Sequence, residues 1–553
     1  MNPMTLLLRR TPVRSCWPIP ILCSAFAVSG CSSGATLPDP VVVIDGVFEE
    51  WTDVSPIVVD PQDAPNGAAV DLGVIHAAAD GHHIFFAVET GRPVNAQAMR
   101  GTLSILIDAD DDRETGEAVG DFPGTDLVVE LSRQDLAGRD GHGSGMALRE
   151  LGSDGLLGDR TNAGGRDLVV APTASASRFE IRLARGALER GEGRVPTGSV
   201  ELEGPLMRAR FVFSYQGSVV DETESVTLTL PPLEGDAPPR WSEGLDPTGD
   251  LRVLVWNVSS ERFRDRPERF ARVMAAMDPD VLLLDEVYGA VTEADLRAFF
   301  SRPELAAREP WEFVLGKSGG RQKTVVASRV GIRPELALED VLYPDGALGP
   351  LAERFPEAER LWDLERERGL ATTGAWVEAA GQPILFVPID LQSAGYDGSF
   401  EDHLRVLQAR TLRAVVMGAL ADSGRPAGVV IGGDLNLVGS HVPLDSLVHG
   451  LDGARDLIPV DTYRLTDRSI ATWRNPDTQF TPGRLDYVLI SSSTLSADQA
   501  FAFEVGELST EMQERLGLAP EDTRLTADHL PLVVDLSITG DPAPRPGPPL
   551  SGS

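Results

Sequence analysis

The hydrophobic pattern changes once along this chain, and that change constrains the architecture more than any other feature. Up to residue 232, short apolar stretches alternate with polar residues between Gly, Asp and Pro turns. After residue 250, continuous apolar runs alternate with stretches of helical periodicity. Strands repeat every two residues and helices about every 3.6, so the first pattern predicts an all-β sandwich and the second an α/β domain.

The predicted elements follow from these two periodicities. Predicted strands of the first region are Val41–Ile44, Ile84–Val88, Leu103–Ile107, Leu127–Leu131, Phe179–Leu183, Ala209–Phe213 and Val226–Leu230. Predicted strands of the second region are Leu251–Trp256, Val281–Leu284, Ile384–Val387, Val429–Ile431, Tyr487–Ile490 and Leu532–Leu536, with helices Arg266–Met277, Glu293–Phe300 and His403–Leu420. We predict a signal at 1–30, a tether at 31–40, the sandwich at 41–232, a linker at 233–250, the α/β domain at 251–540 and a disordered tail at 541–553.

The first thirty residues have the layout of an export signal. Three arginines precede an apolar run from Cys16 to Val28 that is shorter than the about 20 residues of a membrane span. The run ends in Val28-Ser29-Gly30-Cys31, which resembles the bacterial lipoprotein signal; the alternative is a plain secretory peptide. The resemblance implies lipidation of Cys31, anchoring to a membrane, and an outer-membrane, cell-surface or periplasmic location.

Charge limits the class of partner. The chain has 84 acidic and 49 basic residues and a formal net charge of −35. Such a surface repels phosphate backbones. This excludes the non-specific electrostatic binding of DNA that is typical of basic DNA-binding proteins. Phosphate chemistry would therefore need metal ions or a local basic patch.

An acidic loop follows the predicted strand Leu103–Ile107. The carboxylates of Asp108, Asp110 and Asp112, with Asp126 from the next strand, repel one another unless a hard cation lies among them. We predict a calcium site here; the alternative is a solvated acidic hairpin. The spacing lacks the Gly and Glu positions of an EF-hand.

The opening VVVIDGVFEEWTDV of residues 41–54 resembles the start of carbohydrate-binding-module-9-like sandwiches. That resemblance implies a glycan as a partner. Trp51 has two interpretations, stacking on a sugar or packing in the core, and the second is the commoner role of a Trp beside a first strand.

Polar motifs lie at the ends of the hydrophobic strands of the second region. They are Asn257 after LRVLVW, Glu286 after VLLLD, Asp434 and Asn436 in GGDLN, Asp486 in PGRLDY, and Asp528 and His529 in ADHLP. Strand ends of an α/β scaffold expose such groups to one cleft. A pocket of this charge requires a divalent cation, and Glu286 and Asp528 suit a hard ion such as Mg²⁺. The metal would neutralise the pocket for a phosphate ester.

This order of motifs over residues 251–540 resembles the endonuclease/exonuclease/phosphatase superfamily. The resemblance implies a four-layer α/β/β/α sandwich and dependence on Mg²⁺ or Mn²⁺. It implies that Glu286 is the principal metal ligand with Asn257 beside it, that Asp434 and Asn436 align the attacking water, and that Asp486 orients His529. It also implies that His529 and Asp528 act at the phosphate and the metal.

Two positions depart from the family pattern. Asp285 stands where Gln is common, and Asp390 in FVPIDLQSAG stands where a His or Tyr donates a hydrogen bond to phosphate. A carboxylate repels phosphate unless it is protonated or binds a second metal. His403, or Arg321, Lys323 and Arg329 of GGRQKTVVASR, are alternative donors; the other interpretation is that these cations lie on a solvated loop.

The sequence therefore predicts a lipid-anchored, metal-dependent phosphoesterase. Its substrate would be nucleic acid, a phospholipid head group or a small phosphodiester. The alternative is a catalytically impaired surface protein that binds a glycan or another envelope ligand.

Overall fold

The structure is a computed structural model of the whole chain. It describes residues 35–37, 42–134, 144–162, 166–186, 200–234, 240–423, 428–449, 457–475 and 478–539. The predicted signal, Cys31 and the tail at 541–553 lie outside the described residues. Within these ranges, no helix combines the length and apolar character needed to cross a membrane.

Residues 42–234 form a β-sandwich, as predicted. One sheet has the order β1 (Ala35–Thr36), β15 (Val226–Thr229), β13 (Leu206–Tyr215), β5 (Thr102–Asp108), β8 (Leu127–Gln134), β9 (Ser144–Glu150) and β10 (Thr161–Asn162), with β14 (Ser218–Glu222) on β13. The other has the order β11 (Val169–Ala171), β12 (Ala176–Ala184), β4 (His83–Val94), β3 (Val74–Ala79) and β2 (Pro56–Val59). A small hairpin pairs β6 (Glu117–Val119) with β7 (Phe122–Thr125). The core between the two sheets includes Ile75, Phe86, Ile105 and Phe211.

Two details of the sandwich differ from the predictions, and a third decides between two interpretations of Trp51. Part of the predicted tether is folded, because Ala35–Thr36 pairs in parallel with β15 and Leu37 is buried. The predicted strand Val41–Ile44 is reduced to one bridge, in which Ile44 pairs with Ser469 of the α/β region instead of a sandwich strand. Trp51 is 1% exposed and its Nε1 donates to Glu180 at 2.8 Å, so it packs in the core.

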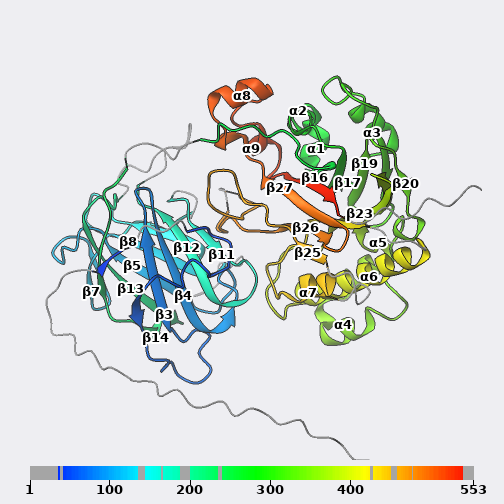
Figure 1. Cartoon of the computed structure of the whole chain (residues 1–553). Coiled ribbons are helices and arrows are strands. Elements are labelled where there is room, and N and C mark those ends of the chain that lie inside the picture. Colours follow the sequence, from blue (N-terminus) through cyan, green and yellow to red (C-terminus); the bar gives the residue numbers. More distant parts are fainter. Residues whose placement is uncertain are drawn as a thin grey trace, which may run out of the picture. The chain divides into compact units, whose positions relative to one another are not determined.

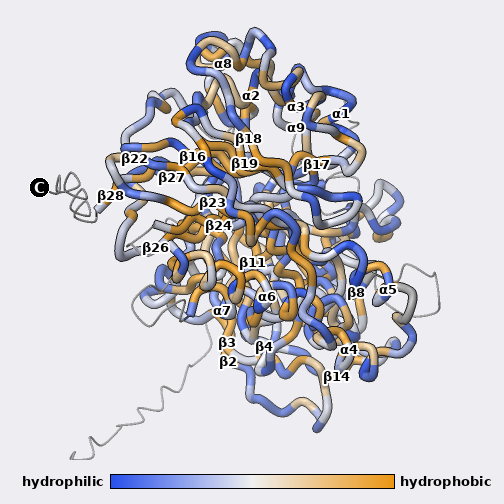
Figure 2. The backbone as a smooth tube through the Cα atoms, turned by 90° about the vertical axis from the view of Figure 1, so that its right-hand side faces the viewer, coloured by the Kyte–Doolittle hydropathy of each residue, from blue (hydrophilic) through white to orange (hydrophobic). Residues whose placement is uncertain are grey.

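Residues 251–538 form two stacked sheets. The first has the order β18 (Glu312–Leu315), β19 (Gln322–Ser328), β17 (Val281–Tyr288), β16 (Leu251–Ser260), β28 (Leu532–Ile538) and β27 (Leu495–Ala502). The second has the order β20 (Arg333–Pro334), β22 (Ala375–Ala379), β23 (Gln382–Asp390), β24 (Gly428–Asp434), β26 (Asp486–Ser491) and β25 (Leu457–Pro459), with β21 (Ala371–Thr372) on β23. Strands of both sheets are among the hydrophobic stretches of Figure 2.

Helices cover the outer face of each sheet. The α-helices are α1 (Glu261–Asp265), α2 (Pro267–Met277), α3 (Glu293–Phe300), α4 (Gly349–Arg354), α5 (Glu359–Arg368), α6 (Phe400–Ser423), α7 (Val442–Val448), α8 (Thr510–Leu516) and α9 (Asp522–Thr526), with 3-10 turns at Leu336–Leu338, Pro356–Ala358 and Val505–Glu507. In Figure 1 the strands lie between α2 and α8 on one side and α6 and α7 on the other.

Strand β16 shows why the sequence produces four layers. Its residues Val253 and Val255 belong to the core between the two sheets. Leu254 and Trp256 point the other way, into the core shared with α2 and α3. A strand buried on both faces reads as a continuous apolar run, which is the pattern of LRVLVW. The predicted four-layer α/β/β/α sandwich is confirmed.

Candidate active site

The local backbone turns the strand ends of the α/β region toward a common cleft. Register shifts lie between Asn257 and Ser260 in β16 and between Leu284 and Val287 in β17. Such bulges change the direction in which a side chain points. Glu286 in the second bulge has a φ of 50°, and Asn436 has a φ of 48°. Left-handed backbone at a non-glycine residue costs about 1–3 kcal/mol, so the surrounding fold holds both residues in place.

Gly433 lets the two central strands of the second sheet approach each other just before Asp434. A Cβ at this position would lie 2.0 Å from the carbonyl oxygen of Ile389, and the φ of 142° is unfavourable for other residues. The close approach places Asp390 and Asp434 opposite each other in the β23–β24 pairing. The glycine therefore brings two of the candidate carboxylates together.

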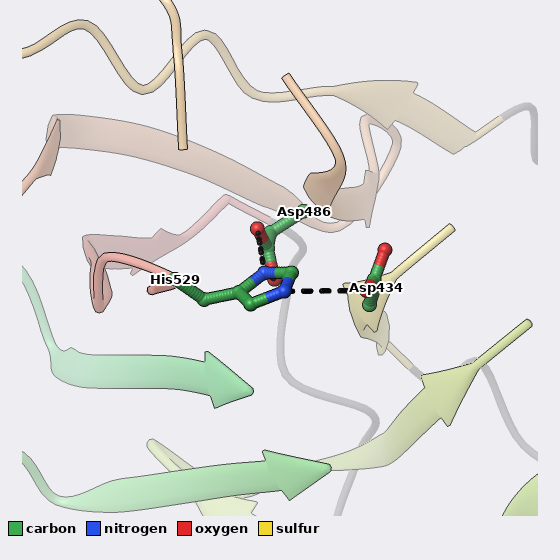
Figure 3. A group of neighbouring side chains, drawn as sticks. All are labelled: Asp434, Asp486 and His529. Carbon is green, nitrogen blue, oxygen red and sulfur yellow. Dashed lines mark hydrogen bonds and ion pairs between the residues drawn. The ribbon is translucent and has the colours of Figure 1, made fainter. Parts of the chain in front are cut away.

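A His–Asp pair lies at one side of the cleft. His529 Nδ1 is 2.9 Å from Asp486 Oδ2, and its Nε2 faces Asp434 Oδ2 at 3.7 Å (Figure 3). Thr472 Oγ1 donates to Asp486 Oδ2 at 2.6 Å and so fixes the carboxylate. The structure brings together the Asp486 and His529 that the sequence analysis paired.

Three carboxylates form the acidic centre of the cleft. Oxygen atoms of Glu286, Asp390 and Asp434 all lie within 4.8 Å of one another. Asn257 Nδ2 donates to Glu286 Oε1 at 3.2 Å and to Asp434 Oδ2 at 3.3 Å, so this amide lies between two of them. Within the described ranges, no Lys or Arg side chain pairs with any of the three, so this charge has no internal counter-ion other than His529.

Asp285 lies behind this centre. It is fully buried, and neither carboxylate oxygen has a hydrogen-bond partner among the described residues. Burial, followed by the charges of Asp390, Asp486 and Asp434, raises its pKa well above the usual value. Burial therefore disfavours the charged form of this carboxyl.

Asp528 and Asn436 complete the predicted set. Ser259 Oγ donates to Asp528 Oδ1 at 2.7 Å, and Arg262 lies 3.8 Å from the same oxygen. Although burial opposes it, His529, Ser259 and Arg262 lower the pKa of Asp528. Asn436 donates its Nδ2 to the Leu391 carbonyl at 2.8 Å, while its backbone N–H donates to Asp434 Oδ1 at 2.8 Å.

The electrostatics separate a base from an acid. Burial, together with Asp486 and Glu286, raises the pKa of Asp434 to about 8, although His529 opposes this. Burial lowers the pKa of His529, but Asp486, Asp434 and Asp528 outweigh it and hold that pKa well above its usual value. These carboxylates therefore favour the protonated, cationic form of the imidazole. Burial and the charges of Glu286 and Asp434 raise the pKa of Asp390 well above its usual range.

The predicted phosphate donors divide between the cleft and other sites. Arg321 lines the cleft and is 75% exposed. Lys323 lines a different pocket, with Phe313 and Glu339. Arg329 does not reach the cleft, because β19 runs away from it; its guanidinium bonds Asp278 at 2.7 Å and the Leu305 carbonyl. His403 is on α6 and packs against Phe355, so it also lies outside the cleft lining.

The cleft has a volume of about 960 Å³. Sequence reasoning missed its aromatic and sandwich members, because they belong to no spaced motif. These members include Asn95, Gln97, Arg133, Thr173, Tyr288, Tyr396, Trp473 and Phe480.

The acidic loop of the sandwich forms a second cluster. Oxygen atoms of Asp108, Asp110 and Asp126 lie within 4.8 Å of one another. Asp108 is fully buried and its Oδ1 has no partner in the described residues, while its Oδ2 pairs with Arg208 at 2.5 Å. The side chain of Asp112 is outside this group and accepts from the backbone of Glu114.

Residues 254–509 match the model of the Endonuclease/Exonuclease/phosphatase family. The chain therefore contains an endonuclease/exonuclease/phosphatase domain. No curated protein matches the chain.

Several solved structures are similar to about half of the chain. Humanized D. rerio TDP2 with 14 mutations has 17% identity and a TM-score of 0.33, covering 52% of this chain and 98% of that one. The human Nocturnin catalytic domain with bound sulfate has 15% identity and a TM-score of 0.35, covering 53% and 97%. An AP endonuclease from Archaeoglobus fulgidus has 15% identity and a TM-score of 0.33, covering 51% and 98%.

Members of this family typically depend on a divalent metal ion, and the residues of this domain fit one. Glu286, Asp390 and Asp434 offer oxygen ligands at mutual distances that a single hard cation can bridge. Asp528 accepts a hydrogen bond from Ser259 and is not part of this three-carboxylate group. Among the described residues, no Lys or Arg forms an ion pair with these three carboxylates, so a bound cation would neutralise their charge.

Proposed function

We propose that the chain is a divalent-metal-dependent phosphoesterase. The observation that carries this proposal is the three-carboxylate group of Glu286, Asp390 and Asp434 directly beside the Asp486–His529 pair. A bound Mg²⁺ or Mn²⁺ would supply Lewis-acid stabilisation of the phosphate oxygens. Hydrolysis would then need a general base, a general acid and a residue that orients each of these two groups.

The protein residues have distinct roles in this proposal. Asp434 would be ionised when a cation offsets the charge of its neighbours, and it then accepts the proton of the attacking water, while the Asn436 backbone fixes one of its oxygens. His529 stays protonated and donates from Nε2 to a phosphate oxygen, while Asp486 holds its Nδ1. Arg262 and Arg321, both on the cleft lining, balance the remaining phosphate charge.

Hydrolysis of bis(p-nitrophenyl) phosphate, of nucleic acid and of a phospholipid head-group ester, each with and without Mg²⁺, tests the proposal. We expect activity on at least one of them that EDTA abolishes and that Glu286→Ala and His529→Ala reduce by about 10²–10⁴-fold. No EDTA-sensitive activity on any phosphate ester would reject the enzyme and favour the binding protein. A glycan array, together with calorimetry of Mg²⁺ at Glu286, then tests that alternative.

We also propose that the sandwich loop binds Ca²⁺ through Asp108, Asp110 and Asp126. The fully buried Asp108 Oδ1, which lacks a partner within the described part of the chain, favours this over a solvated hairpin. Calcium should raise the melting temperature of the wild type, and Asp126→Asn should remove that shift. An unchanged melting curve in millimolar Ca²⁺ would reject the site.

Export and lipidation at Cys31 complete the proposal and rest on the sequence of residues 16–31. Palmitate labelling of the wild type but not of Cys31→Ser, with release of the variant from membranes, tests them. Binding of the sandwich to sugar rests on the resemblance of residues 41–54 alone.

A further inference from the structure

The cleft of the endonuclease/exonuclease/phosphatase domain is lined partly by the sandwich. Residues on its lining come from the loop after β4, from β8 and from the loop after β11. They are Asn95, Gln97, Ala98, Arg133 and Thr173. The part of the chain that carries the catalytic motifs therefore does not build its cleft alone.

Asn95 fixes the sandwich to two loops of the active site. Its Oδ1 accepts from the Asp397 backbone at 2.8 Å, and its Nδ2 donates to the Gly439 carbonyl at 3.3 Å. These two loops follow β23 and β24, the strands that end in Asp390 and Asp434. Asn95 is only 7% exposed, so these bonds are shielded from water and hold the loops in register with the sandwich.

A second set of bonds holds the segment before Asp486. Gln97 Oε1 accepts from the Thr481 backbone at 3.0 Å, and Thr173 Oγ1 donates to the Arg484 carbonyl at 3.2 Å. The Met146 backbone N–H donates to the Gln479 carbonyl at 2.8 Å. The position of Phe480, between these anchors, is thus set by the sandwich.

The side chains on this side of the cleft differ in kind from those at its acidic centre. The Arg133 guanidinium lies 4.9 Å from the centroid of the Tyr396 ring. Phe480 is 38% exposed and Trp473 is half-buried, and both line the same cleft. Aromatic side chains that line the same cleft as a guanidinium are suited to a ligand that carries both a planar ring and a negative charge. We call Arg133, Tyr396, Trp473 and Phe480 the aromatic wall.

Size gives an independent limit. A volume of about 960 Å³ is at the upper end of small-ligand pockets, which run from about 300 to 1,000 Å³. The cleft is bounded by two folded regions that are bonded to each other at Asn95, Gln97 and Thr173. A mononucleotide or a single-stranded end fits such a space, whereas a double helix would have to displace the sandwich.

We propose that the sandwich is the specificity element of the enzyme: the aromatic wall that it anchors binds a planar ring carried on the reacting phosphate and closes the cleft to duplex nucleic acid. This inference rests on the proposed phosphoesterase function, because that function makes the bound ligand a phosphate ester. The inference itself concerns ligand binding, so it is tested separately from turnover.

The test compares two ligands that differ only in the ring. Uridine 5′-monophosphate and ribose 5-phosphate are titrated by calorimetry into the full-length protein with Mg²⁺. Stacking of one base predicts that the uridine ligand binds about tenfold more tightly or better. Phe480→Ala should bring the two dissociation constants to within about twofold of each other, and Phe480→Trp should retain the difference.

Tyr215→Ala is the matched control, because Tyr215 is a sandwich aromatic with 40% exposure that is not on the cleft lining. It should leave the ratio unchanged. A labelled single-stranded 12-mer should compete with uridine 5′-monophosphate, and the same sequence as a duplex should not.

Equal affinity for the two ligands, a ratio that survives Phe480→Ala, or competition by the duplex would overturn the inference. Failure of the proposed function would give a different result. The uridine ligand would still bind more tightly than ribose 5-phosphate, Phe480→Ala would still remove that difference, and no phosphate ester would be hydrolysed.

Discussion

The two acidic clusters of this chain differ in how their charge is balanced. In the sandwich, Arg208 pairs with Asp108 at 2.5 Å, so one carboxylate of the cluster has an internal counter-ion. In the cleft, Glu286, Asp390 and Asp434 have none from Lys or Arg in the described residues, and the nearest cation is the imidazolium of His529. A cluster that contains its own cation can be structural, whereas a cluster without one must obtain its cation from solution or from the substrate site.

The largest effect should come from the base of the cleft. Asp434→Asn keeps the shape of the side chain but removes the proton acceptor, so we expect kcat for phosphodiester hydrolysis to fall by about 10³-fold. Steady-state kinetics with saturating Mg²⁺ measures this. Asp445→Asn on α7, an exposed Asp outside the cleft lining, should keep wild-type kcat. If kcat falls by less than tenfold in Asp434→Asn, another residue must be the general base.

The next effect breaks the balance of the sandwich cluster. Arg208→Met leaves Asp108 buried without its cation, which should lower the free energy of unfolding by about 3 kcal/mol in EDTA. Calcium should raise the free energy of unfolding more in this variant than in the wild type. The reason is that the cluster, like the three carboxylates of the cleft, then has no internal cation. Urea denaturation with EDTA or with Ca²⁺ provides the comparison. Equal calcium shifts in both proteins would contradict it.

The pH dependence of stability should reveal the unbalanced cluster. A carboxyl whose folded pKa is raised stabilises the fold below its unfolded pKa, and this stability is lost as the pH rises through the folded value. For Asp434 the window runs from about 4 to about 8. The metal-free protein should therefore lose stability across this range.

Added Mg²⁺ at about 100 times its dissociation constant should restore about 2.7 kcal/mol at pH 8, and less at pH 5. Thermal melts at the two pH values measure it. A magnesium shift that is larger at pH 5 would have the wrong sign for this cluster.

The smallest effect concerns the third carboxylate. Asp390→Asn keeps an oxygen ligand but removes a charge, so Mg²⁺ affinity should fall by about tenfold, or 1.4 kcal/mol. Calorimetric titration of Mg²⁺ reads this without turnover. If the affinity is unchanged, Asp390 is protonated in the bound state and is not a ligand.

The sequence predicted the acidic centre of the cleft better than the rest of the cleft. Asp434 is the last residue of β24, Asp486 is the first residue of β26, and His529 lies just before β28. Because β24 and β26 pair in antiparallel fashion, the end of one lies beside the start of the other, so this convergence could be anticipated. The α/β helices were also close: the predicted 293–300 agrees with α3 at both ends. A capping box at Thr292 and Asp295 is a local signal of the start of this helix.

What the sequence could not supply depended on contacts between distant segments. Arg329 is the last residue of the basic stretch 319–329, and only the direction of β19 shows that it lies away from the cleft. Ile44 reads as a strand residue of the sandwich but bonds to residues 468 and 470 of the α/β region. Gln97 and Phe480 belong to no motif, since their roles arise from a packing of two folds that leaves no periodic pattern.

The paired hydrogen bonds of Asn95 carry a consequence for how such proteins can be rearranged. Because one amide ties the loops after β23 and β24 to the sandwich, the N-terminal region is not a module that can be exchanged freely for another. A chimera with a foreign sandwich would keep every catalytic motif yet lose the register of two active-site loops. Recombination between relatives should therefore succeed only where the crossover carries the sandwich, residues 42–234, together with its partner loops.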